Sequence, residues 1–164
     1  MSVLRCVAIC SLLAAPSRAA DPPASWARLK TLAGTWQRTD ASTPAQKAFR
    51  IRYRLISADT AMVEEFGDPA KQVTQTVFHP DGERLLATHY CAQGNQPRLR
   101  LRTTPASDAL VFEFLDATNL QHAEDSHLVR LTLRWRDVDH LVREEVYAAK
   151  GREEVATLTL ERTR

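Results

Sequence analysis

The sequence is poor in cysteine and aromatic residues, and it holds no long apolar run. Three of the 164 residues are cysteine, and 7% are Phe, Trp or Tyr. The longest apolar run covers residues 6–15, which is short of the roughly 20 residues that cross a bilayer. Gly-rich phosphate loops, a Gly-x-Ser-x-Gly elbow and a His-Glu-x-x-His motif are also missing. These absences argue against an integral membrane segment and remove the sequence signatures of three common site types.

The first twenty residues predict a secretory signal peptide. A basic residue, Arg5, precedes the apolar run, and the small residues Ala19 and Ala20 follow it. We expect cleavage after one of these two alanines. The mature protein, residues 21–164, is then expected as a single domain in the periplasm or outside the cell.

The predicted mature segment carries no excess of charge and almost no cysteine. Subtracting the two arginines of the signal segment from 22 basic residues leaves 20, against 20 acidic residues. This balance gives no basic footprint for nucleic acid, and aromatic residues do not alternate with the arginines as base-stacking platforms would. Cys91 is the one cysteine left after cleavage, so no intramolecular disulfide can form and the core must hold the fold.

Apolar and charged residues alternate over several stretches. Phe49, Ile51 and Tyr53 alternate with arginines, and the same pattern recurs in 98–102 and 129–136. Such alternation puts apolar and charged side chains on opposite faces of a strand. The pattern and its turn signals predict ten strands, at Thr35–Arg38, Ala48–Ile56, Ala61–Phe66, Val73–His79, Arg84–Cys91, Arg98–Thr104, Ala109–Asp116, His127–Arg136, His140–Ala149 and Glu153–Arg162.

One short helix is expected before the first strand. Ser25 is a candidate N-cap, and Trp26, Leu29 and Leu32 follow at helical spacing. Ten strands in hairpin order after a single helix predict an all-β, up-and-down antiparallel barrel, which leaves no exposed sheet edge. The longest internal connection, residues 117–126, is expected to form a turn of helix or a flap.

The junction between this helix and the first strand resembles the opening of lipocalins and other calycin barrels. The chain runs through Leu32 into Gly34-Thr35-Trp36, a Gly-x-Trp segment. In that superfamily the tryptophan closes one end of the barrel. The resemblance therefore implies a calycin-like barrel in which Trp36 is a structural residue rather than a ligand contact.

Further segments resemble, more narrowly, a family of secreted bacterial lipocalin-like proteins without assigned function. These segments are Phe78–Gly82, Thr88–Cys91, Gly94–Arg98 and Asp139–Leu141. Thr-His-Tyr-Cys followed by Gly-Asn-Gln-Pro-Arg is the most specific part, and the resemblance covers most of residues 21–164. It implies the fold and the export of the chain, and no activity.

Two pairs of adjacent acids interrupt the expected apolar faces. Glu64 and Glu65 are neighbours, as are Glu144 and Glu145, so one member of each pair points inward in either register. An inward carboxylate is costly unless it is paired, hydrogen-bonded or wet. We therefore expect an arginine or tyrosine partner, or water and a ligand, in the interior; alternatively, a strand end or a wet bulge exposes the acids. His127, on the same expected face as Val129, adds to this polarity.

His89 and Cys91 lie two residues apart and share one face of a strand. Imidazole and thiolate together suit zinc or copper, but the sequence places no third ligand beside them. A buried cysteine next to a hydrogen-bonded histidine is the favoured interpretation. No metal or cofactor is predicted.

Asn95 and Arg98 flank an expected hairpin turn. Gly94 and Asn95 tolerate the left-handed backbone of tight turns, which explains the segment structurally. Alternatively, the amides of Asn95 and Gln96 and the guanidinium of Arg98 form a polar collar for a ligand at the barrel rim. The sequence leaves both interpretations open.

The favoured function is non-covalent binding of a small, partly apolar molecule inside the barrel. A barrel of eight strands just holds one small ligand, and ten strands give more room. The expected site has an apolar wall of Phe49, Tyr53, Phe112, Phe114, Leu131 and Trp135, and orienting groups His89, His127 and a glutamate, Glu64 or Glu145. No catalytic step follows from these residues, so an enzyme is not favoured.

Two alternatives stay open. The nitrobindin branch of similar ten-stranded barrels also begins with Gly-Thr-Trp and holds haem through one histidine, and that resemblance implicates His127 or His140. A hydrolase or isomerase would instead use an inward glutamate together with His89.

Overall fold

The computed structural model describes residues 23–71, 73–102 and 108–163. Over these residues the chain forms a closed antiparallel barrel of ten strands with two short helices. The predicted fold class, an all-β up-and-down barrel of about ten strands, is confirmed. The predicted signal peptide, residues 1–20, lies outside the described residues.

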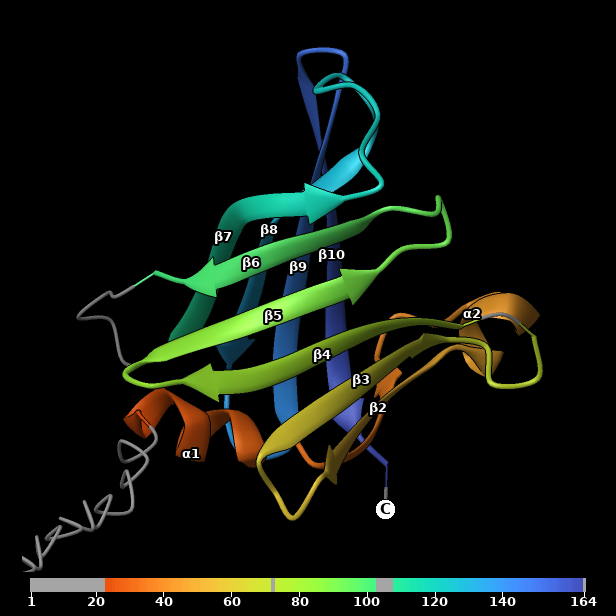
Figure 1. Ribbon diagram of the computed structural model, residues 1–164. Helices are drawn as coiled ribbons and strands as arrows, with labels where there is room; N and C mark the ends of the chain where they lie inside the picture. Colours follow the sequence, from red (N-terminus) through yellow and green to blue (C-terminus); the bar gives the residue numbers. More distant parts are fainter. Residues whose placement is uncertain (1–22, 72, 103–107, 164) are drawn as a thin grey trace, which may run out of the picture.

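The elements follow one another in hairpin order (Figure 1). They are α1 (Ala24–Lys30), β1 (Gly34–Arg38), α2 (Pro44–Ala48), β2 (Arg50–Ile56), β3 (Ala61–Gly67), β4 (Val73–Asp81), β5 (Arg84–Tyr90), β6 (Gln96–Leu101), β7 (Ala109–Thr118), β8 (His127–Trp135), β9 (His140–Ala149) and β10 (Arg152–Arg162). Most strand boundaries lie within two residues of the predicted ones. In the part of the chain described here, no helix is long and apolar enough to cross a membrane.

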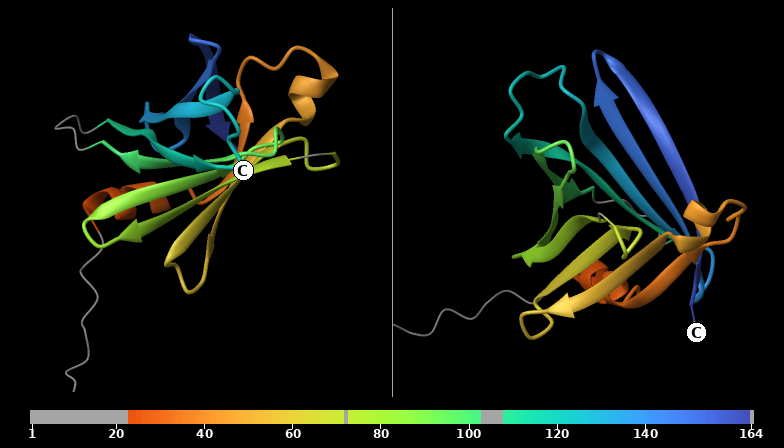
Figure 2. Two further views of the ribbon diagram at one scale, coloured as in Figure 1. Left: turned by 45° about the horizontal axis from the view of Figure 1, so that its top comes forward. Right: turned by 90° about the vertical axis from the view of Figure 1, so that its right-hand side faces the viewer.

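The barrel closes through β1, which pairs with both β2 and β10. β1 has five residues and β10 has eleven, so the ladder between them covers only Trp36–Arg38. The rest of β10 pairs with β9 alone, over a ladder that continues to the hairpin tip. Figures 1 and 2 show this hairpin extending away from the end of the molecule where α1 lies.

Helix α1 covers one end of the barrel (Figure 1). Its residues Trp26 and Leu29 are buried, and Leu32 just after it is fully buried. The N-cap position is Pro23, not Ser25 as expected, and it makes no side-chain cap. The three apolar residues join a core cluster that draws side chains from all ten strands, so this end of the barrel is filled.

Trp36 lies within this cluster and is fully buried. Its indole Nε1 donates a hydrogen bond to the carbonyl of Leu32 over 2.8 Å, and the guanidinium of Arg162 lies 4.3 Å from its ring centroid. Arg162 also donates to the carbonyl of Ala33 over 2.7 Å. A Cβ at Gly34, where φ is +131°, would approach Arg162 to 2.9 Å. Through these contacts, Arg162 holds the last strand against the Gly-x-Trp segment at the start of the first strand.

Helix α2 was not expected. Thr43 and Gln46 form a capping box, in which Thr43 Oγ1 accepts from the Gln46 amide and the Gln46 side chain accepts from the Thr43 amide. Pro44 at the first helical position adds a preset φ angle. β2 consequently begins at Arg50, two residues later than predicted.

A β-bulge changes the predicted inner face of β8. The ladder with β9 shifts by one residue at Val129, so the alternation breaks there. Leu128 is fully buried on the inner face with Leu131, whereas His127 pairs with Ala148. The expectation that His127 and Val129 share the inner face is wrong, because the extra residue reverses the order of faces.

Candidate functional site

A row of polar side chains crosses the inner face of four adjacent strands. The ladders pair Tyr53 with Glu64, Glu64 with Thr76, and Thr76 with His89. All four residues are buried, with at most 2% of their surface exposed. Polar groups in such a position are costly unless partners satisfy them. The partners of this row therefore define the candidate site.

Strand β9 supplies those partners from across the barrel. Arg143, Glu145 and Tyr147 alternate along β9 after the fully buried Leu141, so all share its inner face. β3 and β9 are not neighbours in the sheet, yet Arg143 is hydrogen-bonded to Glu64. This contact spans the interior and joins two walls of the barrel.

Arg143 is the centre of a buried ion triad. Its Nη2 and Nε donate to the two carboxylate oxygens of Glu64 over 2.8 and 3.1 Å. The same Nη2 donates to Glu145 over 2.9 Å. The ring of Phe66 lies 4.5 Å below the guanidinium. One arginine thus serves two carboxylates, in a geometry that lysine cannot reproduce.

Glu64 and Arg143 are both charged in the folded protein. Burial by itself raises the pKa of Glu64, but the charge and hydrogen bonds of Arg143 outweigh it, so the pKa is lowered. Burial likewise acts to lower the pKa of Arg143, and the two glutamates reverse this and raise it well above its ordinary value. Glu64 is therefore an ionised partner of Arg143 rather than an uncommitted base.

His89 connects the polar row to Tyr147. Its Nδ1 lies 3.0 Å from the hydroxyl of Thr76, and its Nε2 lies 3.1 Å from the hydroxyl of Tyr147. Burial lowers the pKa of His89 despite the opposing charges of Glu145 and Glu64. The imidazole is therefore held neutral, with both nitrogens hydrogen-bonded.

Acidification from pH 7.5 to 5.5 is expected to destabilise the fold through His89. Because its pKa is lower in the folded than in the unfolded chain, unfolding takes up a proton. The stabilising contribution is complete above about pH 6.5 and is lost as the pH falls through that value toward the folded pKa. Urea unfolding at several pH values should show a weaker pH dependence for His89→Gln than for the unmodified protein. His122→Gln, in an exposed connection, serves as control, and equal slopes for all three proteins would contradict the assignment.

Two buried polar atoms in this region have no hydrogen-bond partner among the described residues. They are the hydroxyl of Tyr53 and the Oδ1 of Asn95. The hydroxyl of Tyr53 faces the charges of Glu64 and Arg143, and burial raises its pKa well above its ordinary value. The Glu64 carboxylate is its hydrogen-bonding neighbour, at a geometry outside the usual range.

The end of the barrel away from α1 is bordered by aromatic and amide side chains. The rings of Phe114 and His127 lie 4.9 Å apart where β7 bends away from β8. His127 Nδ1 donates to the carbonyl of Asp125 over 2.6 Å, and Asn95 Nδ2 donates to that of Ser126 over 2.9 Å. We call this end, where β9 and β10 reach beyond β1, the mouth.

The structure brings together only part of the predicted site. Tyr53, Glu64, His89 and Glu145 lie in the polar cluster, and Phe114, His127 and Asn95 lie at the mouth. Phe112 packs against Phe78 deep in the core, with ring centroids 5.4 Å apart. Trp135 lies at the closed end, under the guanidinium of Arg28. Arg98 is outside the barrel and pairs with Asp116, so it forms no collar.

Sequence reasoning missed Thr76, Arg143 and Tyr147. The pattern of β9 contained a signal for two of them, because Arg143 and Tyr147 share the parity of Leu141 and Glu145. Choosing the inner face by Leu141 would have selected Glu145 over Glu144 and drawn Arg143 inside. No local pattern pairs Arg143 with Glu64, which lies 79 residues away.

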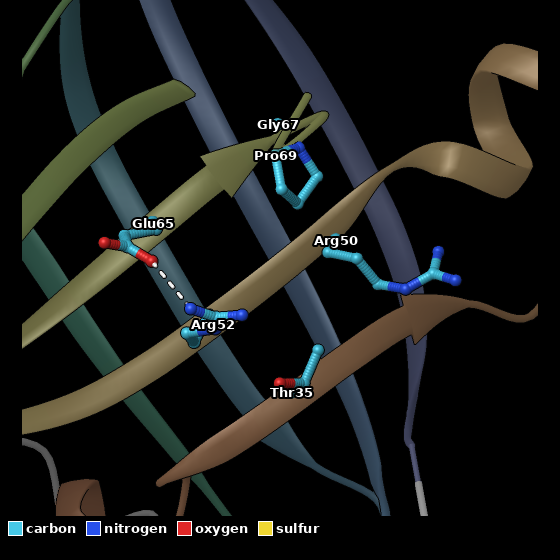
Figure 3. Close-up of a pocket in the computed structure, with 6 residues that line it drawn as sticks. All are labelled: Thr35, Arg50, Arg52, Glu65, Gly67 and Pro69. Carbon is cyan, nitrogen blue, oxygen red and sulfur yellow. Dashed lines mark ion pairs between the residues drawn. The ribbon is translucent and has the colours of Figure 1, made fainter. Parts of the chain in front are cut away.

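A separate groove lies on the outer face of β1, β2 and β3 (Figure 3). It encloses about 220 Å³, and Arg52 and Glu65 approach to 3.9 Å within it. Its lining is Thr35, Arg50, Arg52, Glu65, Gly67 and Pro69. Glu65 is thus the outward member of its pair, and the groove is distinct from the polar cluster.

The described residues contain no group of three or more His, Cys, Asp or Glu side chains placed to hold a metal. His89 uses both ring nitrogens for the Thr76 and Tyr147 hydroxyls, and Cys91 is a free, partly buried cysteine. A scan against protein-family models and a search of curated proteins each found no match to this chain.

Proposed function

We propose that the protein is an exported lipocalin-like carrier that binds a small, partly apolar molecule at the mouth of its barrel. The Gly-x-Trp segment with its buried Trp36, the ten-stranded barrel and the apolar first twenty residues support this proposal. A periplasmic or extracellular location and the bacterial lipocalin-like family are parts of the same proposal.

One observation carries the proposal: the inner face of β10 passes from buried to open along the strand. Leu160 is fully buried opposite Leu141, and Leu158 opposite Arg143 is half-buried. Ala156 lies opposite the buried Glu145 and is exposed. Since all these β10 side chains point inward, the exposure of Ala156 indicates open space above the polar cluster.

The mouth offers the two kinds of surface that a carrier site needs. Phe114 has 38% of its surface exposed, and Tyr147 is half-buried, so apolar contact area is available. Tyr147 and Glu145 supply polar groups at the bottom of the open space. The binding of Glu64 by Arg143 favours a binding site over an enzyme whose general base would be Glu64.

Filling the mouth should abolish binding. We expect Ala156→Trp to weaken the binding of Nile red, a neutral apolar dye, by about tenfold or more, because the indole occupies the space above Glu145. Thr157→Trp is the matched control, since the neighbouring exposed residue points outward. Dye fluorescence titration measures both variants.

Native mass spectrometry of protein purified from its own cell envelope should show a bound small molecule that Ala156→Trp lacks. A Soret absorption band in that material would identify the molecule as haem. Equal dye binding by Ala156→Trp and the unmodified protein would contradict the proposal.

A further inference from the structure

The polar cluster has an uncompensated negative charge. Glu64 and Glu145 are both paired to Arg143, so two carboxylates share one cation. His89 is neutral because its burial lowers its pKa, and the hydroxyls of Tyr53 and Tyr147 stay protonated because burial raises theirs. The cluster therefore holds a net charge of about −1 in a site where charge is costly.

Among the described residues, no other basic side chain on the walls of the barrel offsets this charge. The arginines of β2, β6 and β8 lie on outer faces, where Arg52, Arg98 and Arg130 pair with acids. Arg152 shares the inner face of β10 but lies exposed at the hairpin tip, two residues from the exposed Glu154. These two exposed charges are opposite in sign and lie in solvent, so they do not compensate the excess carboxylate of the buried triad.

The negative charge of the cluster is accessible from the mouth. The side chain of Glu145 is 9% exposed, whereas that of Glu64 is fully buried, so Glu145 is the carboxylate that a ligand reaches. The half-buried ring of Tyr147 lies next along β9, and Phe114 exposes its ring at the same end. A carboxylate beside aromatic rings is the usual environment for an organic cation.

Glu145 also has the hydrogen-bonding capacity that such a cation needs. Tyr53, with 2% of its surface exposed, faces Glu64 and Arg143 and so belongs to the closed part of the cluster. The carboxylate oxygens of Glu145 accept hydrogen bonds, which a protonated amine can donate.

We propose that the carried molecule is an organic cation, an amine with an apolar body, whose charged group lies against Glu145 at the mouth. This inference rests on the carrier function proposed above and names its ligand class. An anionic amphiphile, such as a fatty acid, would meet the net negative charge and is excluded by it.

The test compares head groups on one apolar chain. Decylamine, decanol and decanoate, all below their micelle concentrations at pH 7, compete with Nile red for the unmodified protein. We expect decylamine to displace the dye at about tenfold lower concentration than decanoate, with decanol between them. Equal potency, or a preference for decanoate, would overturn the inference.

Two substitutions test whether Glu145 causes the preference for decylamine over decanoate. Glu145→Gln should reduce the difference between decylamine and decanoate to about twofold while Nile red still binds, because only the charge is removed. Glu144→Gln, the outward neighbour on β9, should keep the full preference. If Glu145→Gln keeps it as well, the assignment of the cation to Glu145 is wrong.

The two proposals fail differently. Loss of the carrier function would appear as Nile red binding that Ala156→Trp does not change. Failure of the ligand class alone would appear as dye binding that Ala156→Trp abolishes, without any ranking of the three head groups. The ranking on the unmodified protein decides the matter even if Glu145→Gln does not fold.

Discussion

Arg143→Met is expected to lower the free energy of unfolding by about 3–5 kcal/mol, because it leaves Glu64 and Glu145 as buried carboxylates without a counter-charge. Arg143 is 1% exposed and makes three hydrogen bonds to the two acids. Arg143→Lys should also destabilise the fold, since a single ammonium cannot donate in parallel to both oxygens of Glu64. Urea unfolding followed by circular dichroism at pH 7 measures the change.

The control for this substitution is Arg130→Met. Arg130 lies 3.9 Å from Glu153 on the exposed outer face, and exposed pairs contribute about 0–1 kcal/mol. The double variant Glu64→Gln with Arg143→Met should recover part of the loss, because the buried charge that remained is removed. If Arg143→Met and Arg130→Met cost the same, Glu64 is not held as a buried ion.

Trp36→Ala is expected to cost about 3–5 kcal/mol, since it removes a large, fully buried side chain from the closed end of the barrel. It also removes the indole ring that packs against the guanidinium of Arg162, and the Nε1 group that donates a hydrogen bond to the Leu32 carbonyl. The substitution therefore loosens the contact between β10 and the α1–β1 junction in addition to leaving a cavity. Thermal unfolding measures the loss.

Val138→Ala is a suitable control for Trp36→Ala. Val138 lies in the turn between β8 and β9 with 74% of its surface exposed, so its truncation should change stability by less than about 0.5 kcal/mol. The loss of stability for Trp36→Phe should lie between those for Trp36→Ala and Val138→Ala, because a smaller ring still fills part of the space. A cost for Trp36→Ala near that of the control would mean that the closed end tolerates a cavity.

Period-2 alternation predicted the starts of all ten strands to within two residues, and the two-residue error at the start of Ala48–Ile56 has a local cause. The capping box of Thr43 and Gln46 begins a helix whose five residues carry no apolar period. The helix is set by its cap, and a search for periodicity does not find it. The bulge at Val129 was not predicted for a similar reason. One residue of β8 is left over in the pairing with β9, and this does not change the composition of the strand.

The candidate site was predictable in kind and only partly in membership. Adjacent acids guaranteed that one of Glu64 and Glu65, and one of Glu144 and Glu145, points inward, whatever the register. An arginine or tyrosine partner for these inward acids was the right chemical expectation, but the sequence did not identify that partner as Arg143. Trp135 and Phe112 were placed in the site because they lie on inner faces, yet distance along the barrel axis separates them from the mouth.

The sequence by itself determined the all-β class, the number of strands and the presence of inward acids, because alternation along a strand is a local property of the chain. Only the tertiary structure decided which acids meet Arg143, that Arg162 lies over Trp36, and which end of the barrel is open. Those facts depend on how far each strand runs and on contacts between strands that are not neighbours in the sheet. Chain closure into a barrel creates such contacts, and no single strand encodes them.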